Sequence, residues 1–348
     1  MKKINLSAKK TIHSFYWNKL KIPKIKKIYN LFKTNLKQFE EKTFSIAVSG
    51  GNDSMALVFL SKCLSFDLGY NFVYYHVDHK IRSSSTQEAK QLKNYLRKLD
   101  IKCKILTVKN KITKNIQSEA RQKRYELLIK HSLNEKVNNL ITAHNKDDVV
   151  ENFFIRLQRG SGLKGLSSFL NISSNIKKHS NFKIIRPLLN VKKFDLKYVN
   201  DNSYNFYIFD KSNEEKKFLR IKIRELIKGL EKEGFSFNNY KLSLDALNKS
   251  NEAIEFYVKK NISKNSQYFK HKNLIVLNSN FFNQPDEIIF RSLSSLILLL
   301  GKKNSYPRGR KMINLINHLK NFNFVSKLTL SGCVFEKIEN SVIIYREI

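Results

Sequence analysis

Two patterns of apolar and polar positions alternate along the first half of the chain, one typical of buried strands and one typical of helices. Four short runs of apolar residues predict buried strands: Phe44–Val48, Phe72–Val77, Cys103–Val108 and Leu140–Ala143. The segments that follow them predict helices: Ser54–Ser65, Ser85–Leu99, Ser118–His131 and Asp147–Leu157. Ser85 and Glu88 together predict a capping box at the start of one of these helices. Strands that alternate with helices indicate βαβ units, and hence an α/β fold with a doubly wound parallel sheet.

The rest of the chain has a different pattern. A basic amphipathic helix is predicted at Ile25–Phe39, and a helix-rich stretch extends to about Lys270. Helices near Glu287–Leu300 and Met312–Asn321 then precede short strands, which we expect around Val325–Leu330 and Val342–Arg346. We therefore predict two domains, residues 1–228 and 229–348, of which the second is a smaller α+β domain with a helical connector.

Charge is the unusual feature of the composition. The chain has 65 Lys+Arg against 29 Asp+Glu, a formal charge of +36 over 348 residues. A polyanionic partner such as nucleic acid fits this excess, because neutralised phosphates release counterions. Lys, Asn and Ile are frequent throughout, so an AT-rich coding sequence is an alternative source of the charge.

Cysteine usage and apolar segments exclude several classes of protein. Cys63, Cys103 and Cys333 lie far apart without a CxxC pair, which argues against a disulfide framework or a local zinc site. The basic N-terminus lacks the continuous apolar core of a signal peptide. The longest apolar patch, Ser294–Gly301, is too short to span a bilayer. We expect a cytoplasmic protein that does not enter a membrane.

The stretch FSIAVSGGNDSMALVFL joins the first predicted strand to its helix. Its turn carries six residues suited to a phosphate: Ser49, Gly50, Gly51, Asn52, Asp53 and Ser54. Backbone N–H groups beside a helix N-terminus attract anions, glycines permit close approach, and serine hydroxyls donate hydrogen bonds. The spacing fits neither a Walker A loop nor a G-x-G-x-x-G dinucleotide fingerprint. The alternative is an ordinary Ser/Gly turn. S-G-G-x-D-S after a first strand resembles the pyrophosphate-binding loop of the PP-loop ATP pyrophosphatases.

Polar side chains also follow the second and fourth predicted strands, at the edge where doubly wound sheets bind ligands. His76 is a candidate for nucleotide contact, with a plain strand-edge histidine as the alternative. An acidic cluster after the fourth strand is conspicuous in so basic a chain: His144, Asp147, Asp148 and Glu151. Asp147 and Glu151 are four residues apart and share a helix face. The alternative is that Asp147 and Asp148 only stabilise a helix N-terminus.

Basic residues give further candidates. Arg121 and Arg124 lie three apart on roughly one helix face, and guanidinium groups bind phosphate in a bidentate manner. Arg159–Gly160 either contacts a ligand or only ends a helix. Arg220 and Arg224 share one face of a basic helix and either contact phosphate or form a solvated surface.

Taken in order, these motifs resemble those of the tRNA(Ile)-lysidine synthetase family. RLQRGSGLKGL, IIRPLL, FDKSNEEKKFLRIKIR, and the C-terminal YPRGRK and LTLSGCVFEKIENSVIIYRE extend the likeness over nearly the whole chain. The resemblance implies an N-terminal PP-loop ATP pyrophosphatase catalytic domain and a C-terminal tRNA-recognition domain. It also implies ligation of free L-lysine to C2 of the wobble cytidine in the CAU anticodon of isoleucine tRNA. An adenylated cytidine would be the intermediate, with release of AMP and pyrophosphate.

This chemistry suggests a role for each candidate. Besides the loop residues 49–54, the expected ATP contacts are His76, Arg159 and Gly160. Departing pyrophosphate needs compensating charge, which Mg²⁺ supplies, and Asp53 is the first candidate ligand. Lysine must attack as a neutral amine, and its deprotonation at pH 7 costs about 4.6 kcal/mol from a reference pKa near 10.4. The candidate catalytic residues are Asp53, Arg121, His144 and Asp147, the candidate lysine ligands are Asp147, Asp148 and Glu151, and the candidate tRNA contacts are Arg124, Arg220 and Arg224.

The chain departs from the family pattern in several places. It has His144-Asn145 where two histidines are usual, which leaves open the role of the second imidazole. Asp210-Lys211-Ser212-Asn213 replaces D-P-S-N, and Arg220-Ile221 replaces Arg-Asn. We also expect the chain to lack the additional C-terminal domain of longer family members.

Two rival functions and one question of assembly remain. Another PP-loop enzyme, a tRNA thiolase, needs cysteines for sulfur or a cluster, but Cys63 and Cys103 fall inside a predicted helix and strand. A non-catalytic basic RNA-binding protein has no need of the intact S-G-G-x-D-S loop. A homodimer is compatible with the sequence, which leaves the oligomeric state open.

Overall fold

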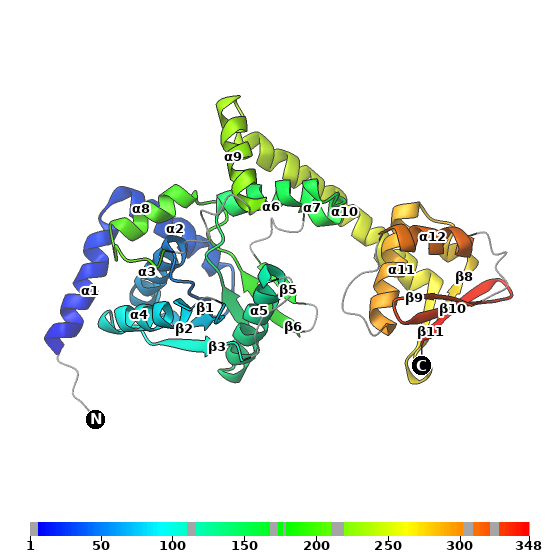
Figure 1. Cartoon of the computed structure of the whole chain (residues 1–348), viewed down its shortest axis with the longest axis horizontal. Coiled ribbons are helices and arrows are strands. Elements are labelled where there is room, and N and C mark those ends of the chain that lie inside the picture. Colours follow the sequence, from blue (N-terminus) through cyan, green and yellow to red (C-terminus); the bar gives the residue numbers. More distant parts are fainter. Residues whose placement is uncertain are drawn as a thin grey trace. The chain divides into compact units, whose positions relative to one another are not determined.

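A computed structural model describes residues 6–81, 83–109, 116–167, 173–176, 179–209, 219–301, 309–320 and 327–347 (Figure 1). The chain divides into two compact units, Met1–Tyr240 and Lys241–Ile348. The motif Asp210-Lys211-Ser212-Asn213, the first part of YPRGRK and the start of the strand expected at Val325 lie outside the described residues.

The first unit contains a six-stranded sheet in the order β3-β2-β1-β4-β6-β5. Its strands are β1 (Thr43–Ala47), β2 (Asn71–Asp78), β3 (Cys103–Thr107), β4 (Asn139–Ile141), β5 (Ser173–Ile176) and β6 (His179–Ile185). All of them run parallel except β5, which pairs antiparallel with β6. From β1 the chain adds β2 and β3 on one side, and later β4 and β6 on the other. The predicted doubly wound sheet is therefore confirmed, with its topological switch point between β1 and β4.

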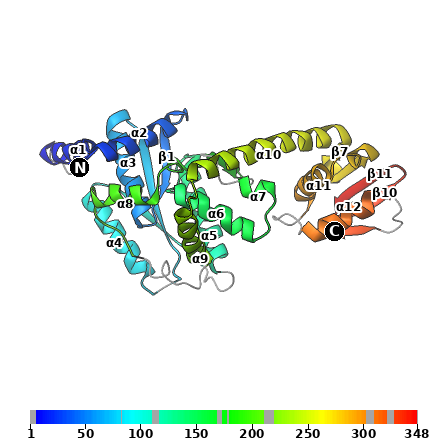
Figure 2. The ribbon, with the colours of Figure 1, turned by 90° about the horizontal axis from the view of Figure 1, so that it is seen from above.

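Helices cover both faces of this sheet. The helices of this unit are α1 (Leu6–Leu20), α2 (Pro23–Lys37), α3 (Asn52–Leu68), α4 (Ser85–Lys98), α5 (Ile116–Asn134), α6 (Lys146–Gln158), α7 (Leu163–Ser167), α8 (Lys193–Asp201) and α9 (Leu219–Lys232), of which α7 and α9 pack on α6. Tyr74 and Tyr75 point to opposite faces, as the two-residue period of a strand requires. Tyr74 packs in the core around α3, whereas Tyr75 packs with Leu128 of α5. Figure 2 shows α3 and α5 on opposite sides of β1 and its neighbours.

Most predicted elements of the first half are confirmed to within a few residues. The capping box is wrong, because the helix N-cap is Ser84 and makes no side-chain cap bond, while the Ser85 hydroxyl donates to Asp78 Oδ1 at 2.9 Å. The stretch up to Lys270 was expected to be helix-rich, but it also contains β5, β6 and β7 (Ser266–Phe269).

The second unit has an antiparallel sheet in the order β7-β8-β11-β10-β9. Its other elements are β8 (Leu274–Asn278), β9 (Leu328–Leu330), β10 (Cys333–Ile338), β11 (Ser341–Arg346), α11 (Asp286–Leu300), α12 (Gly309–Lys320) and the short 3₁₀ helices Lys270–Lys272 and Ser279–Phe281. The long helix α10 (Phe237–Asn265) begins in the first unit and continues into the second. Phe281, Leu293 and Phe335 are buried in the core between sheet and helices. The predicted C-terminal α+β region is confirmed.

Apolar helix segments belong to the protein core. The patch Ser294–Gly301 falls on α11, where Leu293, Leu296 and Ile297 are buried. Within the described ranges, no helix combines the length and the apolar character needed to cross a membrane.

Candidate active site

The carboxyl ends of β1 and β4 lie next to each other, because these two strands pair in parallel at the switch point. The glycine loop, residues 48–51, follows β1 and leads into α3, while His144 and Asn145 follow β4 and lead into α6. On the other side of β1, β2 ends at Asp78. Three segments that are distant in sequence therefore meet at the edge where such sheets bind ligands.

Gly50 has a backbone conformation that favours glycine, with φ at +90°. A Cβ at this position would lie 2.9 Å from Cδ1 of Ile208, a separation that real Cβ atoms do not adopt. The Ile208 N–H also donates to the Gly50 carbonyl at 2.9 Å. The segment around Ile208 therefore fixes the loop in place, and any side chain at position 50 would be strained.

Serine hydroxyls stabilise the loop from within. The Gly50 N–H donates to Ser54 Oγ at 3.0 Å, and the Ser54 hydroxyl donates to the Gly51 carbonyl at 2.9 Å. Ser49 Oγ donates to Ser54 Oγ at 3.1 Å. Ser54 is buried and shapes the loop, whereas Ser49 is exposed and open to a ligand.

Asn52 is held by a neighbouring segment. Its Oδ1 accepts a hydrogen bond from Asn200 Nδ2 at 2.8 Å, and the same Nδ2 donates to the Phe206 carbonyl at 3.1 Å. Asn200 is fully buried at the end of α8. The Asn52 side chain therefore anchors the first turn of α3.

Asp53 lies in the first turn of α3 with one oxygen bonded and one open. Asn145 Nδ2 donates to its Oδ2 at 3.1 Å, while Oδ1 is buried and has no hydrogen-bond partner among the described residues. Burial raises the pKa of Asp53 to about 7, opposed by Lys193 and reinforced by Asp148 and Asp147. A buried carboxylate with an unsatisfied oxygen is costly, so a bound cation or donor would stabilise it.

Asn145 caps the next helix. Its Oδ1 accepts from the Asp148 N–H, and its own N–H donates to Asp148 Oδ2, both at 3.1 Å. This reciprocal capping box starts α6 beside Asp53. Burial raises the pKa of Asp148, although its bond to the Asn145 N–H lowers it.

Asp147 and Glu151 do not act as one pair, although they are one helix turn apart. Asp147 is exposed, and its Oδ2 accepts from the Lys193 N–H at the start of α8, at 2.7 Å. Glu151 is buried and accepts two bonds from Arg224 of α9, Nε to Oε1 at 2.5 Å and Nη2 to Oε2 at 3.2 Å. Glu151, an expected lysine ligand, and Arg224, an expected tRNA contact, are thus bonded to each other.

His144 lies in a strongly positive environment. Its Nδ1 is 2.7 Å from Thr142 Oγ1. Burial and four guanidinium groups lower the pKa of His144 to about 3, so the imidazole is neutral near pH 7. In order of effect, the four arginines are Arg186, Arg121, Arg220 and Arg124. The predicted Arg121, Arg124 and Arg220 are therefore near enough for their charges to act on this histidine.

Two histidines on β2 and after it have structural partners. His76 is buried, and its Nδ1 lies 2.8 Å from the Val48 carbonyl, beneath the glycine loop. Burial lowers the pKa of His76. Arg124 Nε donates to His79 Nε2 at 3.2 Å, which ties α5 to the end of β2.

Arg159 and Gly160 lie at the far end of α6. Arg159 is the helix C-cap, and Gly160 follows with φ at +66°. The 13 residues of α6 separate them from Asn145 by about 20 Å, at 1.5 Å per residue. The structure thus does not bring them to the glycine loop, and their predicted contact with ATP stays a prediction.

No cluster of three or more His, Cys, Asp or Glu side chains that could hold a metal exists within the described ranges. Mg²⁺ does not require one, because it often binds through one or two carboxylates together with substrate phosphates and water. The buried, open oxygen of Asp53 fits that mode of binding.

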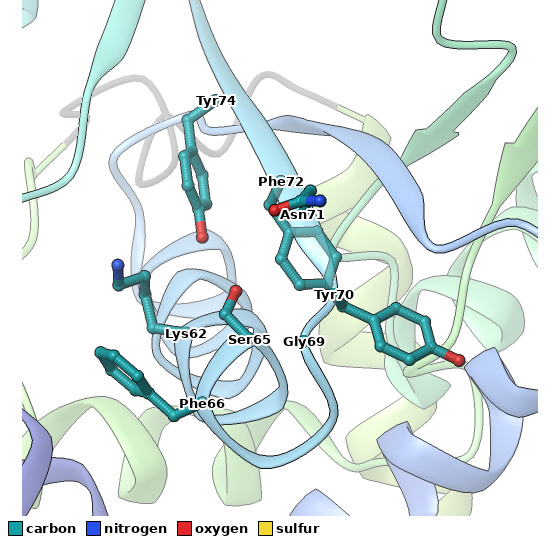
Figure 3. Close-up of a pocket in the computed structure, with 8 residues that line it drawn as sticks. All are labelled: Lys62, Ser65, Phe66, Gly69, Tyr70, Asn71, Phe72 and Tyr74. Atoms are coloured by element: carbon teal, nitrogen blue, oxygen red, sulfur yellow. The ribbon is translucent and has the colours of Figure 1, made fainter.

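A hollow of about 300 Å³ lies elsewhere in the first unit (Figure 3). It is lined by the last turns of α3 and the start of β2, including Lys62, Phe66, Tyr70 and Tyr74. This is the amino end of β2, opposite the edge that carries the glycine loop. None of the predicted site residues lines the hollow, and the convergent polar groups place the candidate site at the other edge.

Sequence reasoning missed three residues that build the site. The sequence presents Asn145 only as a departure from a histidine pair, and it gives no reason to select Asn200 or Ile208. Asn145 had a local signal, since Asn followed three residues later by an acid before an apolar run indicates a helix cap. Asn200 and Ile208 had none, because their contacts to Asn52 and Gly50 join segments far apart in the chain.

Comparison with known proteins agrees with this geometry. The sequence pattern of the PP-loop domain family matches residues 23–230, so the first unit is a PP-loop domain. Over 327 residues the chain is 36% identical to the tRNA(Ile)-lysidine synthase of Orientia tsutsugamushi (strain Boryong), covering 89% of this chain and 71% of that protein. With the enzyme of the same name from Rickettsia typhi (strain Wilmington) it shares 31% identity over 334 residues, covering 92% and 74% of the two chains. The chain belongs to the tRNA(Ile)-lysidine synthase family.

A solved structure supports the fold alone. The U34-tRNA thiolase NcsA of Methanococcus maripaludis superimposes with a TM-score of 0.54 at 18% identity, covering 64% of this chain and 79% of that one. At this level of identity the likeness shows a shared architecture and nothing about the reaction.

Proposed function

We propose that this protein ligates free L-lysine to C2 of the wobble cytidine in isoleucine tRNA with a CAU anticodon, using ATP. One observation carries the proposal. Asn145 connects Asp53, beside the PP loop, to Asp148, in the acidic first turn of α6, with hydrogen bonds of 3.1 Å. A nucleotide-binding loop and a group of acids suited to an amine therefore share one site, in a chain whose relatives are named for lysidine synthesis.

In the first step, the C2 carbonyl oxygen of cytidine attacks the α phosphorus of ATP. An O–P bond forms, the bond from the α phosphorus to the bridging oxygen breaks, and pyrophosphate leaves. The N-terminus of α3 and the exposed Ser49 hydroxyl favour the phosphates, because helix N-termini and donor groups attract anions. Gly50 and Ile208 keep this loop in a fixed shape.

Asp53 would hold Mg²⁺ through its open Oδ1. When bound, the ion offsets negative charge that accumulates on the departing pyrophosphate. Burial raises the pKa of Asp53 to about 7, and the charges of Lys193 and Arg224 only partly offset this effect. A bound cation would favour the ionised carboxylate further.

In the second step, the ε-amine of lysine attacks C2, a C–N bond forms, and the C2–O bond to AMP breaks. Asp148 is the best placed of the four candidates to receive the amine proton. His144 is a weak base because its pKa is about 3, and Glu151 is paired with Arg224. Asp147 and Asp148 each accept one backbone N–H, but only Asp148 is joined to Asp53 through Asn145. The raised pKa of Asp148 brings it closer to that of a useful base.

Arginines supply the contacts to tRNA in this proposal. The charges of Arg121, Arg124 and Arg220 all act on His144 and lower its pKa, and guanidinium groups bind phosphate strongly. The excess of 65 Lys+Arg over 29 Asp+Glu adds long-range attraction to RNA. Arg224 joins this group only when its bond to Glu151 is exchanged for a phosphate. The expected cytoplasmic location and homodimer stay predictions.

The cysteines of this chain argue against sulfur transfer. Cys63, Cys103 and Cys333 are all buried, and burial raises the pKa of the Cys103 thiol to about 12. Burial likewise raises the pKa of the Cys63 thiol far above its ordinary value and that of Cys333 to about 11. Thiols held in this state are poor nucleophiles and poor cluster ligands.

Release of pyrophosphate tests the proposal against its rivals. The protein should release pyrophosphate from ATP when isoleucine tRNA and lysine are both present, and no added sulfur donor should be needed. Release that required a sulfur donor would favour a thiolase. No release under any condition would favour a non-catalytic RNA-binding protein.

A further inference from the structure

Asn145 makes hydrogen bonds with both of its side-chain ends. It is fully buried, with 0% exposure. Oδ1 accepts from the Asp148 N–H, the Asn145 N–H donates to Asp148 Oδ2, and Nδ2 donates to Asp53 Oδ2, all at 3.1 Å. Since Asp53 lies in the first turn of α3 and Asp148 in the first turn of α6, one amide connects the N-terminal turns of two helices.

We infer that Asn145 is a positioning residue for the adenylation step, which holds Asp53 by Oδ2 so that Oδ1 is left to bind the cation of MgATP. This inference rests on the proposed function. Asp53 Oδ1 is buried and unbonded within the described ranges, while Oδ2 is engaged by Asn145. When one oxygen of a carboxylate is held by a hydrogen bond, its other oxygen has a single orientation. Residues that hydrogen-bond to metal ligands strengthen metal binding in this way.

The helix cap and the bond to Asp53 use different atoms, so substitution can separate them. Serine at position 145 keeps a good N-cap oxygen but has no amide to reach Asp53. Aspartate also keeps the cap, but it replaces the donor with a negative charge that faces Asp53. Histidine has one acceptor and one donor nitrogen, and so it can replace both functions of the amide. It is also the residue that the family resemblance leads one to expect at this position.

Calorimetry on the full-length protein tests the inference. The affinity for ATP is measured with Mg²⁺ and with EDTA, and the ratio of the two dissociation constants gives the gain due to the ion. Asn145→Ser should lose about 10–100-fold of this gain, the range found when partners of metal ligands are removed. Its affinity for ATP in EDTA should be unchanged. Asn145→His should recover most of the gain.

Controls make each outcome decisive. Asp53→Asn shows how much of the Mg²⁺-dependent gain in ATP affinity remains when residue 53 has no carboxylate. If this variant keeps the wild-type gain, Asp53 is not the ligand and the inference is overturned. A wild-type gain in Asn145→Ser, with only the melting temperature lowered, shows that Asn145 is a structural cap and also overturns it. Should the serine variant fail to fold, Asn145→Asp is compared with Asn145→His, and a gain in the histidine variant alone supports the inference.

The inference and the proposed function can fail separately. If wild-type protein shows the Mg²⁺-dependent gain but does not attach lysine to isoleucine tRNA, the proposed substrate is wrong. The role of Asn145 toward MgATP would still be supported by the serine and histidine variants.

Discussion

Arg224 and Glu151 form a two-point ion pair across α9 and α6, with Nε–Oε1 at 2.5 Å and Nη2–Oε2 at 3.2 Å. The Glu151 side chain is only 3% exposed, whereas the Arg224 side chain is 31% exposed. The two partners therefore depend on each other unequally, because water can solvate the guanidinium but not the carboxylate.

This asymmetry predicts unequal effects of mutation. Arg224→Met leaves a buried charge without compensation and should lower the free energy of unfolding by about 3 kcal/mol. Glu151→Gln keeps an acceptor for a partly solvated arginine and should cost about 1 kcal/mol. Urea denaturation of both variants measures the difference. Equal costs would contradict the asymmetry.

Gly50 and Gly51 form a matched pair for the loop. Gly50→Ala should destabilise the protein by about 2 kcal/mol or more, because a side chain at φ +90° is strained and would meet Ile208 at 2.9 Å. Gly51 has φ at −75°, and the nearest atom to a Cβ there is Ser49 Oγ at 3.7 Å. Gly51→Ala should therefore cost less than about 1 kcal/mol. Thermal unfolding checks the order, and a larger cost at position 51 would refute this account of the loop.

His144 predicts a dependence of stability on pH. Burial and the surrounding arginines lower its pKa to about 3 in the folded protein, below the ordinary value near 6.5. Between these values the unfolded chain binds a proton that the folded chain does not, so stability from this residue falls as the pH drops below 6.5. The wild type should lose about 1–3 kcal/mol more than His144→Gln between pH 7 and pH 4.5, at 1.36 kcal/mol per unit. Parallel curves for the two proteins would show that His144 is not held neutral.

The raised pKa of Asp53 predicts that its carboxylate lowers the stability of the protein, although the same carboxylate is needed to bind the cation of MgATP. Burial raises its pKa to about 7, so the ionised carboxylate costs free energy in the ligand-free protein. Asp53→Asn removes this charge and should stabilise the ligand-free protein at pH 8 by about 1 kcal/mol or more. MgATP should stabilise the variant no more than ATP with EDTA does, whereas it should stabilise the wild type more than ATP with EDTA does. Denaturation without nucleotide, with ATP and EDTA, and with MgATP tests both points, and a less stable variant would contradict them.

The sequence predicted what depends on neighbouring residues. The apolar run after Gly51 predicted α3, and the alternation of strands and helices predicted the parallel sheet with the glycine loop at its edge. The strands β5 and β6 escaped prediction because they lie in a polar stretch, and the cap of α4 shifted to Ser84 because Ser85 bonds to Asp78.

Contacts between distant residues could not be predicted. Asn145 and Asp53 are 92 residues apart, and Arg224 and Glu151 are 73 apart. The sequence placed Glu151 with lysine and Arg224 with tRNA, because nothing local indicates that the two side chains meet. Only the packing of α9 on α6 brings them together.

Lysine transfer to tRNA tests the central claim most directly. Labelled lysine is incubated with the protein, ATP and Mg²⁺, together with isoleucine tRNA bearing CAU or, in parallel, with methionine tRNA that has the same anticodon. The account predicts label in the isoleucine tRNA alone and none with Asp53→Ala. If the wild type labels neither tRNA, although ATP still exchanges with pyrophosphate, the PP-loop chemistry stands and the proposed substrate is contradicted.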